Sequence, residues 1–292
     1  MDVGIVVALG LALVSTTLTN LAYLREHDAA AELPVLCMRR PLHSARLLVE
    51  DRSWMVGFAM ESSGFLLYAA ALALASLALV QSISAGGIGV LAFASARLAR
   101  RRLSHQELTG VLLSVLGLVA LAASLAGGHN KGGGGDLVPI LLWLGVTGAV
   151  AVAVFLLGRR LVGVAVADAV AGGLFFSIGD ISTKLTTQGG ARFAFVVTLI
   201  IGYTLGTALL QLGYQAGGAL TVAGLATLLT NALPIAAGTV VLDEPVPPGA
   251  LGGVRVLAFA AVTTGAVMLA RPDKPSETKA QLAAGGRPAP SA

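Results

Sequence analysis

Residues 54–96 read WMVGFAMESSGFLLYAAALALASLALVQSISAGGIGVLAFASA, and this stretch decides the fold class. It runs for forty-three residues with one formally charged side chain, Glu61. A helix at the surface of a soluble domain needs only one apolar stripe, whereas this stretch is apolar on all sides. A bilayer crossing requires about 20 such residues. The stretch therefore predicts two consecutive transmembrane helices, joined by a tight turn near residues 73–76.

Similar apolar segments recur almost to Arg271. Hydrophobic residues make up 56% of the chain and charged residues 12%, against about 25% charged in an ordinary soluble domain. The sequence therefore predicts an all-α polytopic membrane protein of about nine transmembrane helices. The predicted spans are Val3–Leu24, Trp54–Ala73, Ser76–Ala96, Glu107–Ala126, Leu137–Leu157, Val164–Lys184, Phe193–Gly213, Ala219–Leu242 and Ala250–Ala270.

The positions of lysine and arginine predict the orientation in the membrane. With nine spans and the N-terminus outside, fifteen of the 19 basic residues fall in cytoplasmic segments. Lys131, Lys184 and Arg192 lie in outer loops or at outer helix ends, and Arg255 lies within the last span. We therefore predict a multi-pass protein of the cytoplasmic membrane with a cytoplasmic C-terminus. Residues 26–51 carry acids as well as arginines, and they either form a loop or contain a short interfacial helix.

Composition also predicts the domain organisation and the partners. Residues 1–271 form one transmembrane domain, and residues 272–292, rich in Pro, Ala, Gly and charges, form a disordered cytoplasmic tail.

The basic residues are topology signals, so we expect membrane lipids and a small-molecule or ion substrate as partners and no nucleic acid. Cys37 is the only cysteine, which excludes an intrachain disulfide. The oligomeric state is left open between a monomer and a homodimer.

The chain contains an internal repeat. A shift of 142 residues pairs Gly64 with Gly206 and Gly110 with Gly252 while spans and loops stay aligned. The paired helices are five spans apart, so the two copies have opposite orientations. Such inverted repeats, here about 3–126 and 137–270, are typical of secondary transporters with a substrate path at the repeat interface.

Several motifs resemble one transporter family. Gly57-Phe-Ala-Met-Glu61 with the following Gly64-Phe65 is similar to the second helix of NIPA-type magnesium transporters, a branch of the drug/metabolite transporter (EamA-like) superfamily. Residues 177–184, SIGDISTK, resemble the mid-chain helix of that branch, and residues 210–245 resemble the closing hairpin of the superfamily. The resemblance implies an inverted-repeat α-helical transporter bundle without specifying its substrate.

The chain departs from the superfamily pattern in its first half. The superfamily carries Gly-Glu before the last helix of each half, whereas this chain has Arg101-Arg102-Leu103 in the first half and retains an acid, Glu244, only in the second. The first half also lacks one helix of the ten-span plan, in agreement with the nine-span NIPA-like variant.

Ionisable residues inside the spans are the first candidates for function, because a buried charge costs at least a few kcal/mol. Glu61 lies about 10 Å from the cytoplasmic end of its span. Desolvation favours its neutral form, so Glu61 is a candidate proton or cation site. The alternative is a carboxyl group hydrogen-bonded to neighbours such as Ser62 or Ser63.

Further charges lie in the second half. Asp180 and Lys184 share one helical face and either form a simple pair or belong to the pathway. Asp180 and Arg255 both fall in the outer third of the membrane, so Lys184 and Arg255 are candidate gate charges. Asp168, near a helix start, is predicted to be a solvated end charge.

Uncharged polar residues inside the spans have two interpretations. They line a shared substrate or coupling-ion pathway with Glu61 and Asp180, or they form interhelical hydrogen bonds. These residues are Asn20, Gln81, Ser84, Gln211, Gln215, Thr227 and Asn231. The sequence GxxxG from Gly202 to Gly206 and from Gly213 to Gly217 allows close helix packing or reflects composition alone.

Three sequence features that could suggest an enzyme or a metal site do not contain the residues that such a site requires. Ser104-His-Gln-Glu107 is a helix capping box, and the glycine-rich loop 127–136 lacks the Gly-Lys-Ser/Thr of a phosphate site. The four histidines have no metal-ligand spacing. We expect no enzymatic activity, no catalytic residue and no cofactor.

Three functions remain open from the sequence. The first is a secondary transporter that moves a small solute by alternating access. The second is a NIPA-like transporter of Mg²⁺ or another divalent cation, with Glu61 and Asp180 as its metal-contacting acids. The third is a membrane scaffold without transport activity.

Overall fold

The computed structural model describes residues 3–84, 87–98, 104–125, 134–243 and 249–270. Every regular element in these ranges is helical. The first half contains α1 (Val3–Glu32), α2 (Pro41–Glu50), α3 (Arg52–Leu74), α4 (Leu77–Ser84), α5 (Gly87–Leu98) and α6 (His105–Leu125). The second half contains α7 (Leu137–Ala153), a π-helical turn Val154–Gly158, α8 (Arg159–Leu161), α9 (Val164–Thr187), a 3-10 turn Gly190–Phe195, α10 (Val196–Ala216), α11 (Ala219–Val240) and α12 (Ala250–Ala270).

Six continuous helical segments of the described chain are long and apolar enough to cross a membrane. These segments are Gly4–Glu32, Arg52–Leu74, Leu137–Leu161, Val164–Thr187, Gly190–Ala216 and Ala219–Val240. The other three predicted spans coincide with α4 and α5, with α6, and with α12. The protein is thus a multi-pass helical membrane protein, and the count of nine crossings remains a prediction.

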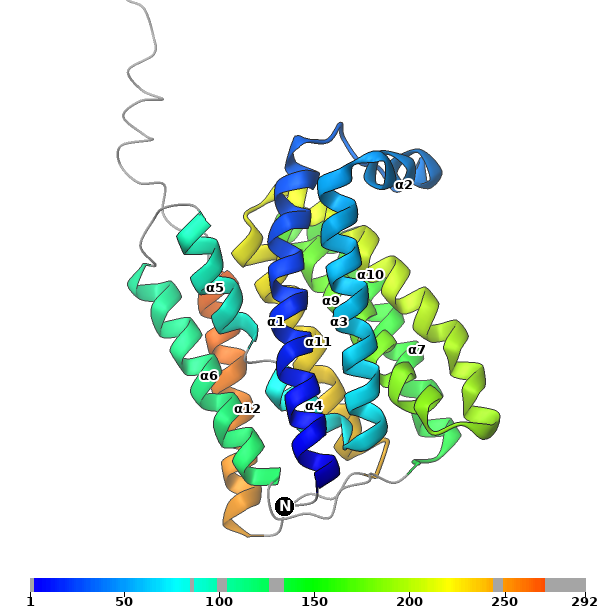
Figure 1. Cartoon of the computed structure of the whole chain (residues 1–292), viewed down its shortest axis with the longest axis vertical. Coiled ribbons are helices and arrows are strands. Elements are labelled where there is room, and N and C mark those ends of the chain that lie inside the picture. The colour runs from blue at the N-terminus through cyan, green and yellow to red at the C-terminus, as the bar shows by residue number, and fades with distance from the viewer. Residues whose placement is uncertain (1–2, 85–86, 99–103, 126–133, 244–248, 271–292) are drawn as a thin grey trace, which may run out of the picture.

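The predicted end of the first span at Leu24 is wrong. The helix continues to Glu32, because residues 25–32 (REHDAAAE) contain no helix breaker before Pro34. Its polar residues are accommodated by packing, since Glu26 is fully buried against another helix. For residues 26–51 the sequence left open either a loop or a short interfacial helix. The structure contains such a short helix, α2. It lies across the end of the bundle (Figure 1), with Leu48 buried and Leu42 exposed.

The turn between the second and third spans is confirmed at Ala75. α3 is capped at its N-terminus by Asp51, whose side chain accepts a hydrogen bond from the Trp54 amide, and it ends at Leu74. The capping box before α6 is also confirmed. Ser104 Oγ accepts from the Glu107 amide at 3.2 Å, and Glu107 Oε2 accepts from the Ser104 amide at 2.8 Å. Glu244, Lys131 and the predicted tail lie outside the described residues.

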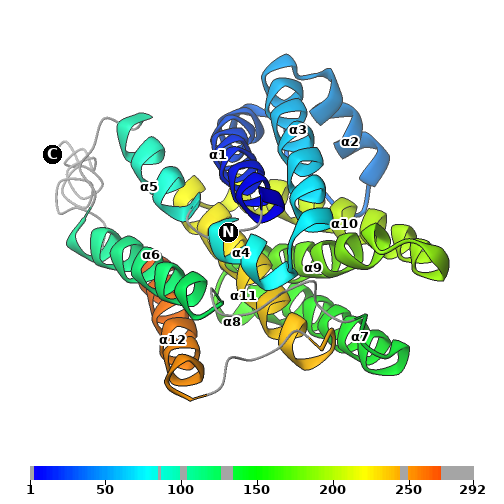
Figure 2. The ribbon, with the colours of Figure 1, turned by 60° about the horizontal axis from the view of Figure 1, so that its bottom comes forward.

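The helices pack in three groups. α1 lies along α3, α9 lies along α10, and α6 lies along α12, while α4 and α11 occupy the middle (Figures 1 and 2). The α9 and α10 pair is packed through glycine, as predicted for Gly202 and Gly206. A Cβ atom on Gly202 would lie 2.8 Å from Gly179 N and from Phe175 O. Small residues therefore bring these two backbones into direct contact.

The predicted orientation remains a prediction, and residues at the two ends of the bundle allow it to be tested by labelling. α1 begins at the lower end of Figure 1 and α12 ends toward the upper end, as an odd number of crossings requires. Cys37, exposed after α1, is predicted to be cytoplasmic, and Ala191, exposed after α9, is predicted to be outside. In intact cells an impermeant maleimide should label Ala191→Cys in a Cys37→Ser background and leave wild-type Cys37 unlabelled until the membrane is opened. The reverse pattern would invert the topology.

Candidate functional site

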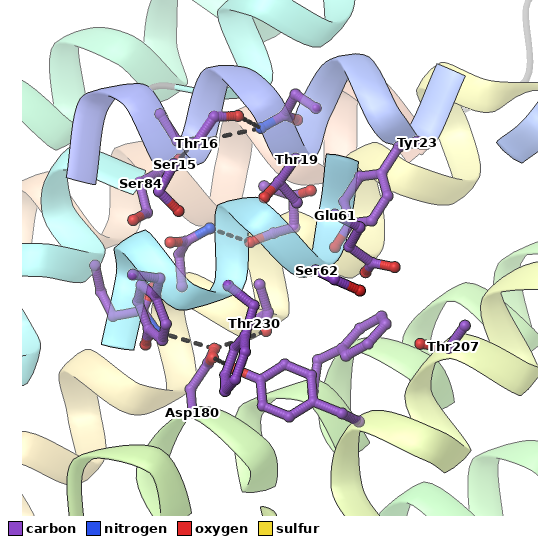
Figure 3. A pocket seen from close by; sticks show the side chains of 18 of the residues that line it. Ser15, Thr16, Thr19, Tyr23, Glu61, Ser62, Ser84, Asp180, Thr207 and Thr230 are labelled. Carbon is purple, nitrogen blue, oxygen red and sulfur yellow. Dashed lines mark hydrogen bonds between the residues drawn. The ribbon is translucent and has the colours of Figure 1, made fainter. Parts of the chain in front are cut away.

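A cavity of about 340 Å³ lies between the two halves of the bundle. Its walls come from α1, α3 and α4 of the first half and from α9, α10 and α11 of the second (Figure 3). Most of its polar lining consists of neutral hydroxyl and amide groups. These residues are Ser15, Thr16, Thr19, Asn20, Ser62, Gln81, Ser84, Thr204, Thr207, Thr227, Thr230 and Asn231.

The charges and rings of the lining define its electrostatic character. Glu61 and Asp180 are the two acids among the described lining residues, and no lining residue is basic. Figure 3 shows Glu61 beside Tyr23 and Ser62, well apart from Asp180 beside Thr230. Aromatic rings complete the wall, and they belong to Tyr23, Phe58, Phe65, Tyr68, Phe176 and Tyr203. The cavity therefore presents oxygen atoms and negative charge and suits a positively charged or neutral occupant.

Asp180 is held by three neutral donors from three other helices. Tyr203 Oη donates to Oδ1 at 2.5 Å, while Thr230 Oγ1 and Gln81 Nε2 each donate to Oδ2 at 2.9 Å. Gln81 Nε2 also donates to Tyr68 Oη at 2.6 Å. Hydrogen bonds to a carboxylate stabilise its charged form, so this network fixes Asp180 as an acceptor and joins α4, α9, α10 and α11.

Glu61 has a partner that the sequence analysis missed. Its carboxyl group lies within hydrogen-bonding reach of the carboxyl group of Glu26 on α1. Gln211 of α10 donates from Nε2 to Glu26 Oε2 at 2.6 Å, and the Glu26 side chain is fully buried. The predicted alternative partner, Ser63, donates instead to Ala59 O within its own helix. The structure thus brings two acids and an amide together next to the cavity.

Several buried oxygen atoms of the lining have no hydrogen-bond partner among the described residues. Asn231 Nδ2 donates to Thr227 O at 2.5 Å and Asn20 Nδ2 donates to Thr16 O at 2.8 Å, which leaves both amide oxygens unpaired. Ser84 Oγ and Thr227 Oγ1 are also unpaired. Buried polar atoms are normally satisfied, so these four oxygen atoms are exceptions among the described residues.

The predicted pathway residues separate into two sets. Glu61, Gln81, Asp180 and Asn231 line the cavity, whereas Gln211 lies outside the described lining and donates to Glu26. Gln215 does not belong to the lining. Its amide donates to Ala30 O and Leu33 O and accepts from the Leu36 amide, so it holds the loop between α1 and α2.

The predicted gate charges have different partners from those expected. Lys184 Nζ donates to Leu72 O at 2.9 Å and to Ala75 O at 2.7 Å, at the turn after α3. Arg255 Nη2 donates to Thr239 Oγ1 at 2.6 Å, on the same helix α11 as Thr230, which donates to Asp180. The structure therefore ties Lys184 and Arg255 to separate helix contacts.

Asp168 differs from its predicted role as a solvated end charge. Its side chain is fully buried and accepts two hydrogen bonds of 2.7 Å from the Arg159 guanidinium group. Burial is possible because the chain turns at Gly163, with a φ of 89°, and brings Arg159 back onto α9. This acid is neutralised within the described structure.

Comparison with known proteins gives one informative match. The chain is similar to a probable magnesium transporter. It is 27% identical over 140 residues to a protein of Arabidopsis thaliana described as probable magnesium transporter NIPA9, and the match covers 48% of this chain. The chain spans 39% of the length of that relative. No family model matches the chain, and no solved structure matches it.

Proposed function

We propose that the chain is a membrane transporter that carries a divalent cation, with Mg²⁺ as its substrate. The observation that carries this proposal is the cavity between the two halves, which has a largely apolar wall and contains two acids and no basic side chain among its described lining residues. Hard cations bind oxygen ligands, and a cavity of one sign concentrates ions of the opposite sign. The similarity to a protein described as a probable magnesium transporter supports the same substrate.

The size of the cavity supports a hydrated ion. Mg²⁺ gives up its waters reluctantly, and six waters at about 30 Å³ each occupy roughly 180 Å³. The cavity of about 340 Å³ is large enough for this shell. No group of three or more histidine, cysteine, aspartate or glutamate side chains in the described part of the chain is placed to hold a bare metal ion. Neutral oxygens such as those of Asn20 and Asn231 would then contact the water shell.

The location of the cavity supports a transport mechanism. It lies between helices of the two predicted repeats, about 3–126 and 137–270, where inverted-repeat transporters bind their substrates. Rocking of one half against the other would expose the cavity to each side of the membrane in turn.

A small organic cation is the second candidate. The six aromatic rings of the lining favour it, because aromatic faces attract a desolvated cation by cation–π interaction. In that case Glu61 and Asp180 would serve as its counter-charges.

Flux through liposomes decides between the candidates. The full chain is reconstituted with an internal Mg²⁺ indicator, and Mg²⁺ entry is compared with uptake of radiolabelled organic cations and neutral metabolites, with and without a pH gradient. We expect Mg²⁺ entry well above that of empty liposomes. Organic uptake without Mg²⁺ entry would replace the proposal with the second candidate, and no flux of any solute would contradict both.

A further inference from the structure

The buried acids of the described bundle differ in their partners. Asp168 is paired with the Arg159 guanidinium group, and Asp180 receives three hydrogen bonds from neutral donors. Glu26 receives one hydrogen bond, from Gln211. Glu26 and Glu61 face each other, and no basic side chain among the described residues pairs with either of them.

The surroundings of the pair contain unused ligand atoms. Glu26 Oε1 has no hydrogen-bond partner among the described residues, although the side chain is fully buried. The Gln211 amide that donates to Glu26 Oε2 carries a second unpaired oxygen, Oε1, and this side chain is 1% exposed. A buried amide oxygen beside two carboxyl groups accepts a hydrogen bond when a carboxyl group is protonated, and it is a ligand for a cation when both are ionised.

The packing of α1 against α3 fixes the spacing of the two acids. A Cβ atom on Gly57 would lie 2.7 Å from Glu26 Cγ, so glycine at this position lets the Glu26 side chain pass between the helices. Glu61 lies one helical turn further along α3 and lines the cavity. Glu61 thus faces the cavity, whereas Glu26 and Gln211 are buried and do not belong to its described lining.

We infer that Glu26 and Glu61 together form a cation-binding site at the edge of the cavity, completed by the Gln211 amide oxygen. Two carboxylates carry a charge that one divalent cation neutralises, which favours a divalent over a monovalent ion. Gln211 is also a positioning residue, because its Nε2 orients Glu26. The inference deepens the proposed function, since it names where the transported ion binds, and it distinguishes this site from Asp180, whose two oxygens are already occupied.

Binding of Mn²⁺, a paramagnetic substitute for Mg²⁺, tests the site without any transport. The purified full chain in detergent is titrated with Mn²⁺ and free ion is measured by electron paramagnetic resonance. Wild type should bind Mn²⁺ in a manner that Mg²⁺ displaces. Glu26→Gln and Glu61→Gln should each weaken binding by at least about tenfold, and the double variant should be little weaker than either alone, because both acids serve one ion.

The control variant is Glu50→Gln, which removes an exposed acid paired with Arg46 on α2. It should bind as wild type does. The site would be overturned if folded Glu26→Gln bound Mn²⁺ with the same affinity as wild type. If Glu26→Gln does not fold, the same comparison is made with folded Glu61→Gln. The absence of Mn²⁺ binding by wild type would also overturn the site. Binding that depends on both acids in a protein without Mg²⁺ flux would retain the site and overturn the proposed function.

Discussion

Asp180→Ala is expected to cost the protein more stability than loss of any exposed acid. The substitution leaves Tyr203 and Thr230 without their acceptor, while Gln81 Nε2 retains Tyr68 Oη. A buried donor without a partner costs about 1–3 kcal/mol, so the free energy of unfolding should fall by roughly 2 kcal/mol. The measurement is the melting temperature in detergent, followed by fluorescence-detected size-exclusion chromatography.

Asp28→Ala provides the control for Asp180→Ala, because the Asp28 side chain is 55% exposed. Its melting temperature should stay close to that of wild type. The melting temperature of Asp180→Asn should lie between those of Asp180→Ala and Asp28→Ala, since an amide retains one acceptor oxygen and loses the charge. Equal melting of Asp180→Ala and Asp28→Ala would show that the donors find other partners, and the network would then have no structural role.

Gly202→Leu is expected to separate α9 from α10. The new side chain would collide with backbone atoms of Gly179 and Phe175, which cannot move aside as the end of a flexible side chain can. Overpacking of a core typically costs about 1–3 kcal/mol, and a clash with backbone on two residues should reach the top of that range. The yield of monodisperse protein and its melting temperature measure the loss.

Gly145→Leu is the matched control for Gly202→Leu. Gly145 lies within α7, and a Cβ atom there has nothing within 4 Å. Both substitutions replace a glycine within a helix by the same residue, so they share the gain in helix propensity and differ in packing. A melting temperature of Gly202→Leu equal to that of Gly145→Leu would mean that the two helices are not in close contact in the membrane protein.

Hydropathy predicted most of the helical fold, because membrane crossing imposes length and apolarity on each segment separately. Six continuous segments meet both conditions in the described structure. The end of α1 was predicted too early because the prediction relied on the apolarity of the segment. The residues Arg25, Glu26 and His27 lower the local hydropathy, and the packing of Glu26 and His27 against α10 shows that the helix continues as a partly buried element.

Part of the candidate site was also predictable. Polar residues inside apolar spans are few, and most of those singled out, including Gln81, Asp180 and Asn231, lie around one cavity. The role of Gln215 and the missing acid Glu26 were not predictable, because both depend on which helices become neighbours. A polar residue that binds a loop and one that lines a cavity look alike in the sequence.

The two hydrogen bonds of Lys184 to the turn after α3 bear on how often the protein changes shape. Movement of α3 away from α9 at this end breaks both bonds. Bonds to a charged group are worth about 1.5–3 kcal/mol each, so the combined cost is at least about 3 kcal/mol. At about 1.4 kcal/mol per factor of ten, fewer than about one molecule in a hundred would have this end open at rest. A lysine that contacts no substrate would thereby determine how rarely the resting protein admits ions from that side.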